Sequence, residues 1–250
     1  MEAADYFDDL AAFYDAYYGE VIDANDVDFY RELAREADGP VLEVGCGTGR
    51  VYLEVLRDGV DAYGIDVSEG MLEVLRENAA AAGLEPSVRR ADVTEFDPER
   101  EYALAIVPFR AFLHLLEIDD QLAALERLHD ALAPGGRLAL NAFAPNFDVI
   151  CETYGRWEKT EFEVDGATYV HRTVTELVDE VEQVARIRSE VLDADGEVVA
   201  ENEAPLALVS RREFELLFRL SPFSAWEVYG GFERAPLEST DQEMVWIAER

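Results

Sequence analysis

The stretch VLEVGCGTGR, Val41–Arg50, decides which fold this chain is expected to adopt. A short strand-like run, apolar except for Glu43, leads into a turn in which Gly45, Gly47 and Gly49 alternate. Glycine in such a turn lets the backbone approach a ligand closely, because no side chain stands in the way. An apolar helical pattern then continues from Gly49 to Asp58. The stretch therefore predicts a strand, a ligand-binding turn and a helix, in that order.

The same alternation of strand and helix continues on both sides of this turn. A long aromatic-rich helical segment is expected over residues 5–37, and Ser68 and Gly83 are suited to cap a later helix. Because strands alternate with helices, the sheet is expected to be mostly parallel, with helices on both faces. The further elements are expected as strands at 61–66, 87–90, 101–107 and 137–143, and helices at 68–82 and 119–133.

The pattern changes after Pro145. The pairs Asp165-Gly166 and Asp195-Gly196 each stand between strand-like runs, which is typical of hairpin turns. Residues 157–209 are therefore expected to form an antiparallel insert of roughly four strands. Ser210 then caps a predicted helix that ends at Leu220, and two final strands are expected at 225–229 and 244–248.

The charge of the chain is extreme. Its 250 residues include 55 Asp and Glu but only 21 Lys and Arg, which gives a formal net charge of −34. The carboxylates are spread along the chain, and self-repulsion at this density destabilises a compact state unless salt screens it. We therefore expect a surface adapted to a salt-rich cytoplasm, and the acidity says little about the substrate. The 49% hydrophobic content is ample for a core.

Several classes of protein are not expected. No apolar run approaches the length of a membrane span, and the N-terminal MEAADYFDDL lacks the basic and apolar regions of a secretion signal. Cys46 and Cys151 make no disulfide framework, so a cytoplasmic protein without a membrane partner is expected. The three histidines have no metal-binding spacing, so we expect no metal site.

The glycine spacing separates the possible cofactors. Dinucleotide-binding turns read G-x-G-x-x-G, whereas residue 50 here is Arg. A phosphate-binding loop needs a Gly-Lys pair, which the chain lacks. The pattern present is E-x-G-x-G-x-G, from Glu43 to Gly49. With this pattern the chain resembles the class I S-adenosylmethionine-dependent methyltransferases.

Later motifs of that family follow in order over residues 40–145: YGIDVS, RRADVTEFD and LAPGGRLALNAF. The resemblance implies S-adenosyl-L-methionine as cofactor, with Glu43 near its amino group and Asp66 on the ribose hydroxyls. It also places Asp92 and the N–H of Val93 at the adenine, whereas Met71 is either core or adenine contact. The cofactor-binding candidates are Tyr17, Glu43, Gly45, Cys46, Gly47, Gly49, Asp66, Val67, Met71, Asp92, Val93 and Pro108.

The resemblance and the element pattern together predict an α/β fold. We expect a doubly wound, Rossmann-like sheet of seven mostly parallel strands, with the last strand antiparallel, and an inserted antiparallel β subdomain. The expected divisions are an N-terminal helical cap (1–39), a cofactor-binding core (40–150), the insert (151–209) and a C-terminal helix with strands that complete the core sheet (210–250).

The segment VPFRAFLHLL, residues 107–116, follows the fourth strand and is the expected wall for the methyl acceptor. It lacks the Asn/Asp-Pro-Pro-Tyr/Phe motif of many DNA and RNA methyltransferases. It resembles small-molecule N-methyltransferases of the amino-sugar N,N-dimethyltransferase and glycine/sarcosine type, which implies a functional role for His114. The imidazole suits accepting a proton or holding a hydroxyl. The alternative is a partly buried histidine with a backbone partner.

The N-terminal YFDDLAAFYDAYYGE is the expected second wall. Its rings could hold a sulfonium by cation–π attraction, and a hydroxyl could position the acceptor, with Tyr14 favoured over Tyr17. The alternative is hydrophobic docking of this segment. The related chains often read Tyr-Gly-Asp-Phe near the C-terminus, whereas this chain has Gly231 in place of that Asp.

The predicted function is methyl transfer from S-adenosylmethionine to a nitrogen or oxygen of a small molecule, with His114 and Tyr14 as catalytic candidates. The alternatives are a tRNA or protein methyltransferase and a cofactor-binding protein without chemistry. No nucleic-acid partner is expected, because the Arg pairs are too isolated to make a basic groove. A monomer or homodimer is expected.

Overall fold

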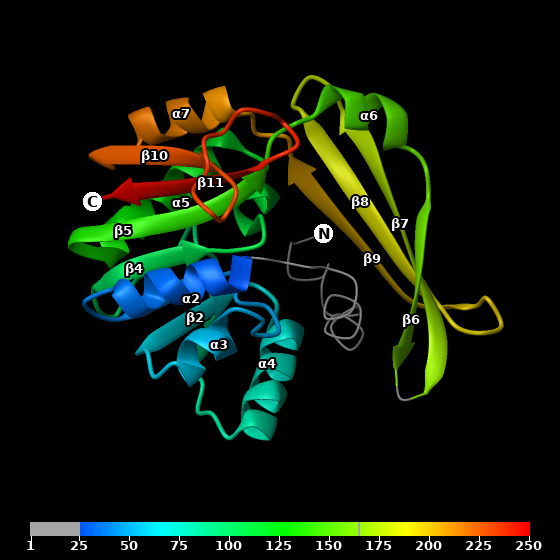
Figure 1. Cartoon of the computed structure of the whole chain (residues 1–250), viewed down its shortest axis with the longest axis horizontal. Helices are drawn as coiled ribbons and strands as arrows, with labels where there is room; N and C mark the ends of the chain where they lie inside the picture. Colours follow the sequence, from blue (N-terminus) through cyan, green and yellow to red (C-terminus); the bar gives the residue numbers. More distant parts are fainter. Residues whose placement is uncertain (1–25, 165) are drawn as a thin grey trace.

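The computed structural model describes residues 26–164 and 166–250, which form two sheets. The larger sheet has seven strands in the order β10-β11-β5-β4-β1-β2-β3, and the smaller has four in the order β6-β7-β8-β9. Figure 1 shows helices against the faces of the larger sheet and the smaller sheet standing beside it. This architecture confirms the predicted fold class.

The larger sheet is parallel except at one strand. β11 pairs antiparallel with β5 on one side and with β10 on the other, so the antiparallel last strand lies inside the sheet. Its strands are β1 (Val41–Val44), β2 (Ala62–Asp66), β3 (Val88–Arg90), β4 (Tyr102–Val107), β5 (Leu132–Phe143), β10 (Ala225–Gly230) and β11 (Glu243–Glu249).

Helices cover both faces of this sheet, as a doubly wound fold requires. Leu33, Tyr52 and Leu75 bury one face under α2, α3 and α4, and Leu125 and Phe214 bury the other under α5 and α7. The helices are α2 (Asp26–Glu36), α3 (Tyr52–Arg57), α4 (Glu69–Ala82), the 3-10 helix η2 (Ala111–His114), α5 (Ile118–Ala131), α6 (Phe147–Thr153) and α7 (Arg211–Leu220).

The predicted helix caps are confirmed. The backbone N–H of Met71 donates to Ser68 Oγ at 3.1 Å at the start of α4, and Gly83 ends this helix with φ +69°. Ser210 begins α7 with a capping box, in which Glu213 N–H donates to Ser210 Oγ at 3.3 Å and Ser210 N–H donates to Glu213 Oε2 at 2.6 Å.

Some boundaries differ from the prediction. The helix expected from Gly49 begins at Tyr52, because the glycine turn continues through Val51. β5 begins at Leu132 rather than residue 137, because Leu132 already pairs with Tyr102 of β4 ahead of a register shift. Helices η2 and α6 were not predicted. Of the helix expected over residues 5–37, α2 is the part that lies within the described residues.

The smaller sheet consists of β6 (Glu158–Val164), β7 (Ala167–Asp179), β8 (Val184–Leu192) and β9 (Val198–Ala207), all antiparallel. Gly166 and Gly196 turn the first and last hairpins with φ +79° and +82°. Ion pairs such as Arg172–Glu190 lie across one face of the sheet. Among the helices described, none is both long and apolar enough to cross a membrane.

Candidate active site

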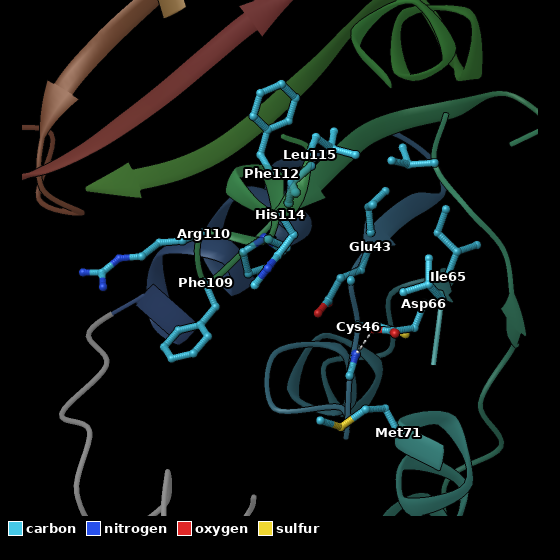
Figure 2. Close-up of a pocket in the computed structure, with 18 of the residues that line it drawn as sticks. Glu43, Cys46, Ile65, Asp66, Met71, Phe109, Arg110, Phe112, His114 and Leu115 are labelled. Atoms are coloured by element: carbon cyan, nitrogen blue, oxygen red, sulfur yellow. Dashed lines mark hydrogen bonds between the residues drawn. The ribbon is translucent and has the colours of Figure 1, made fainter. Parts of the chain in front are cut away.

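A cavity of about 390 Å³ lies at the carboxyl ends of β1, β2 and β4, where ligands bind in open α/β sheets. Residues of β8 and β9 line it on the side of the smaller sheet. Figure 2 shows Glu43, Cys46, Asp66 and Met71 on one side of it and Phe109, Arg110 and His114 on the other. Of the predicted residues, the cavity is lined by Glu43, Gly45, Cys46, Gly47, Asp66, Val67, Met71, Asp92, Val93, Pro108 and His114.

The glycine turn and Asp66 form one hydrogen-bonded unit. The N–H of Gly47 donates to Asp66 Oδ2 at 2.8 Å, the bond drawn in Figure 2, and the N–H of Ser68 donates to Oδ1 at 2.9 Å. Gly47 has φ +51°, and a Cβ there would meet no atom of residues 26–164 or 166–250 within 4 Å. A Cβ on Gly45 would lie 2.9 Å from Ala111 Cβ. The turn is therefore a cradle that only glycine leaves open.

Glu43 is a buried carboxyl at the end of β1. Burial raises its pKa well above the usual range, nearby Arg50 opposes this, and the charges of Asp26 and Asp66 add to it. Arg50 itself binds Asp26 through both guanidinium nitrogens, each at 2.6 Å. A ligand cation beside Glu43 would favour its ionised form, so this corner of the cavity suits a positively charged group.

The other cofactor candidates have different surroundings. Asp92 Oδ1 accepts hydrogen bonds from the N–H and the hydroxyl of Thr94, both at 2.8 Å, which fixes the loop after β3. Gly49 does not line the cavity: a Cβ there would lie 2.8 Å from Leu53 Cγ and 3.0 Å from Leu75 Cγ, so it allows α3 and α4 to pack closely. Tyr14 and Tyr17 lie outside the described residues.

His114 has the backbone partner that one of its two sequence interpretations predicts, and it also lines the cavity. It is partly buried in η2, and its Nδ1 lies 3.1 Å from the carbonyl oxygen of Pro205. Because a carbonyl only accepts, Nδ1 carries the proton, and Nε2 of the neutral ring is an acceptor. Burial lowers the pKa of His114, and the bond to Pro205 opposes this. A neutral imidazole therefore lines the cavity at physiological pH.

The turn after β4 is strained, and the sequence did not predict it. Phe109 and Arg110 both have positive φ, +53° and +65°, which is costly for side-chain-bearing residues. Arg110 Nε and Nη2 bind the two carboxylate oxygens of Glu243 at 2.9 and 2.7 Å, and Asn141 donates to Glu243 Oε1 at 2.6 Å. Tyr30 in turn donates to Asn141 Oδ1 at 2.8 Å. This network ties the cavity wall to β5, β11 and α2, and no short-range sequence signal announces it.

The smaller sheet supplies lining residues that the sequence prediction did not name. They alternate along their strands, so they share one face. The alternation in the sequence predicts that these residues share one face of the smaller sheet. It does not predict which face of that sheet is turned toward the cavity. These residues are Ile187 and Ser189 on β8, and Asn202, Ala204 and Leu206 on β9.

Within residues 26–164 and 166–250, no three His, Cys, Asp or Glu side chains are placed so that they could hold a metal ion.

Part of the chain is similar to a known protein family. Residues 41–136, from β1 to the start of β5, match a family described as "methyltransferase domain". This segment therefore resembles a methyltransferase domain. Its bounds take in the glycine turn, Asp66, Asp92 and His114, and they exclude the smaller sheet.

Curated relatives match about half of this chain. A ubiquinone biosynthesis O-methyltransferase of Ruegeria pomeroyi is 31% identical over 112 residues, 44% of each chain. An uncharacterised methyltransferase of a Geobacillus strain is 31% identical over 137 residues, 55% of this chain and 62% of that protein. The matches thus span about half the length of these relatives.

Solved structures resemble the whole chain. The CcbJ methyltransferase of Streptomyces caelestis has a TM-score of 0.82 at 24% identity, covering 99% of this chain and 98% of its own. CalS10, an amino pentose methyltransferase of Micromonospora echinaspora solved with bound S-adenosylmethionine, has a TM-score of 0.73 at 21% identity, covering 96% of both chains. At these identities the likeness shows the fold alone, and that shared fold includes both sheets.

Proposed function

We propose that this chain is a class I S-adenosylmethionine-dependent methyltransferase that methylates a nitrogen or oxygen of a small molecule, with nitrogen favoured. The observation that carries the proposal is the shared cavity. The glycine turn with Asp66 lines one end of it and the neutral His114 another part, in a segment that matches methyltransferase domains. The amino pentose activity named for CalS10 favours a nitrogen acceptor.

The residues present fit this cofactor. The open side of Gly47 leaves room for a ligand against the backbone, and buried Glu43 suits an ammonium group. Asp66 is fixed by two N–H donors and is therefore oriented to accept ribose hydroxyls. Asp92 and Val93 line the cavity after the next strand, at the proposed adenine end. S-adenosylmethionine, when bound, supplies an activated methyl group on a sulfonium.

The protein itself aligns the two reactants, excludes water from the site and removes a proton from the acceptor. Alignment of two reactants in a closed site supplies much of the rate of such a transfer. An ammonium substrate must lose a proton before its nitrogen lone pair can attack the methyl group, and Nε2 of neutral His114 is suited to take that proton or to orient the amine. Tyr14 is proposed as a second positioning group. We further propose a cytoplasmic monomer or homodimer without a nucleic-acid partner.

The test is methyl transfer to small amines. Incubation with S-adenosylmethionine and either cyclohexylamine or the aminocyclohexanols should give S-adenosylhomocysteine and a methylated amine, both measured by mass spectrometry. His114→Ala should lower turnover by about 10²–10⁴-fold, the range for general acid–base groups, while S-adenosylhomocysteine affinity stays at the wild-type value. Loss of cofactor affinity in this variant would contradict the role of His114, and transfer to none of the amines would contradict a small-amine acceptor.

The pH profile provides an independent readout. Because the pKa of His114 is lowered, the ring is neutral above the ordinary histidine value of about 6.5 and becomes protonated only at lower pH. Wild-type turnover should therefore fall on the acid side of that value, and this ionisation should be missing from the profile of His114→Ala. An identical acid limb in both proteins would assign it to another group.

A further inference from the structure

The smaller sheet contributes polar groups to the cavity that the methyl-transfer site does not use. Ser189 on β8 and Asn202 on β9 are direct cross-strand partners, and both line the cavity. Opposed side chains on neighbouring strands lie close enough to act on one ligand group together. Ile187 pairs with Ala204 in the same way, next to them on the same face. The sheet thus presents one polar pair beside an apolar one.

Asn202 has an unmet hydrogen-bonding requirement. Its Oδ1 is buried and accepts no hydrogen bond from any described residue. A buried amide oxygen without a donor costs stability, and such groups in native proteins are usually satisfied by a ligand or a water. Ser189 opposite is buried, and its hydroxyl can either donate or accept. The pair is therefore poised to receive a hydrogen-bond donor from a bound molecule.

The surroundings restrict what that molecule can be. None of the five lining residues from the smaller sheet is charged, and Phe112, Leu115 and Phe143 add apolar surface. His114, whose ring is held by Pro205 of β9, lines the same cavity. The Asn202 acceptor therefore lies in a largely apolar wall. A compact molecule that has an apolar skeleton and a hydrogen-bond donor besides its amine is complementary to this wall.

We propose that Asn202, assisted by Ser189, is the specificity-determining residue that binds a hydroxyl or amine hydrogen of the methyl acceptor, at a position remote from the methylated atom. This inference rests on the proposed function, since it assumes that the cofactor occupies the glycine-turn end. Its consequence is discrimination: an acceptor that lacks the second donor leaves Asn202 Oδ1 unsatisfied and binds more weakly.

The test compares amines that differ by one hydroxyl. Cyclohexylamine and the 2-, 3- and 4-aminocyclohexanols are titrated calorimetrically into protein saturated with S-adenosylhomocysteine. Wild type should bind at least one aminocyclohexanol about tenfold more tightly than cyclohexylamine, the effect of one hydrogen bond to a buried group. Asn202→Leu should abolish this ratio by weakening only the aminocyclohexanol.

Two further variants serve as controls for Asn202→Leu. Asn202→Asp retains an oxygen acceptor of the same size and should keep the preference, whereas Glu201→Gln, one residue away on the opposite face of β9, should leave both affinities unchanged. Unaltered S-adenosylhomocysteine affinity shows that each variant is folded.

Each outcome is decisive. No preference in wild type, no binding of any aminocyclohexanol, or an undiminished preference in Asn202→Leu would overturn the role of Asn202 while leaving the proposed function intact. Failure of the wild type to bind S-adenosylhomocysteine would instead contradict the proposed function itself.

Discussion

Asp66 joins the glycine turn to the end of β2, through the bonds from Gly47 and Ser68. Asp66→Ala should weaken S-adenosylhomocysteine binding by about 1.5–3 kcal/mol, the contribution of hydrogen bonds to a charged group. Calorimetric titration measures this directly. Asp120→Ala, an exposed carboxylate at the start of α5, is the matched control and should bind as wild type. Equal affinities for the two variants would remove Asp66 from the cofactor site.

The positions of residues at the ends of parallel strands could be predicted from the sequence. Glu43 and Asp66 lie in short strands and Asp92 lies two residues after one, and parallel strands bring such ends to one edge. Asn202 and Glu243 were not predictable in this way. The side chain of Asn202 lines the cavity because of a register between two strands, and Glu243 meets Arg110 across 133 positions of sequence. Short-range patterns do not encode such pairings.

The helix α7 depends on its capping box. Ser210→Ala removes the hydroxyl that accepts the N–H of Glu213, so this donor keeps only its bond to the Ser210 carbonyl and the capping box is lost. The free energy of unfolding should fall by about 1 kcal/mol, measured by urea denaturation. Ser87→Ala, at an exposed position before β3, should have no effect beyond a few tenths of a kcal/mol. Equal stability of the two variants would show that the cap contributes nothing.

Elements with local signals were predicted well, and elements without them were not. The hairpins at Gly166 and Gly196 and the cap at Ser68 follow from turn and cap chemistry that is visible in the sequence. Helix η2 has no such signal, because the left-handed residues before it are Phe109 and Arg110 rather than glycine. Its position depends on the pairing of Arg110 with Glu243, which is a tertiary interaction.

The whole molecule carries far more carboxylates than cations can neutralise. With 55 Asp and Glu against 21 Lys and Arg, most acidic groups have no cationic partner available. Their mutual repulsion is long-ranged in dilute buffer and is screened within about 3 Å at 1 M salt. The melting temperature, followed by circular dichroism, should therefore be much higher in molar KCl than in dilute buffer. Equal melting temperatures would refute adaptation of the surface to salt.

The central claim is that the cavity at the glycine turn binds S-adenosylmethionine, and one measurement tests it most directly. The wild-type protein is titrated calorimetrically in molar KCl with S-adenosylmethionine, S-adenosylhomocysteine and NAD. We expect saturable binding of S-adenosylmethionine and S-adenosylhomocysteine and no binding of NAD, because the turn between β1 and α3 has the spacing E-x-G-x-G-x-G. Binding of NAD alone would contradict it, together with every role assigned to Glu43, Asp66 and His114.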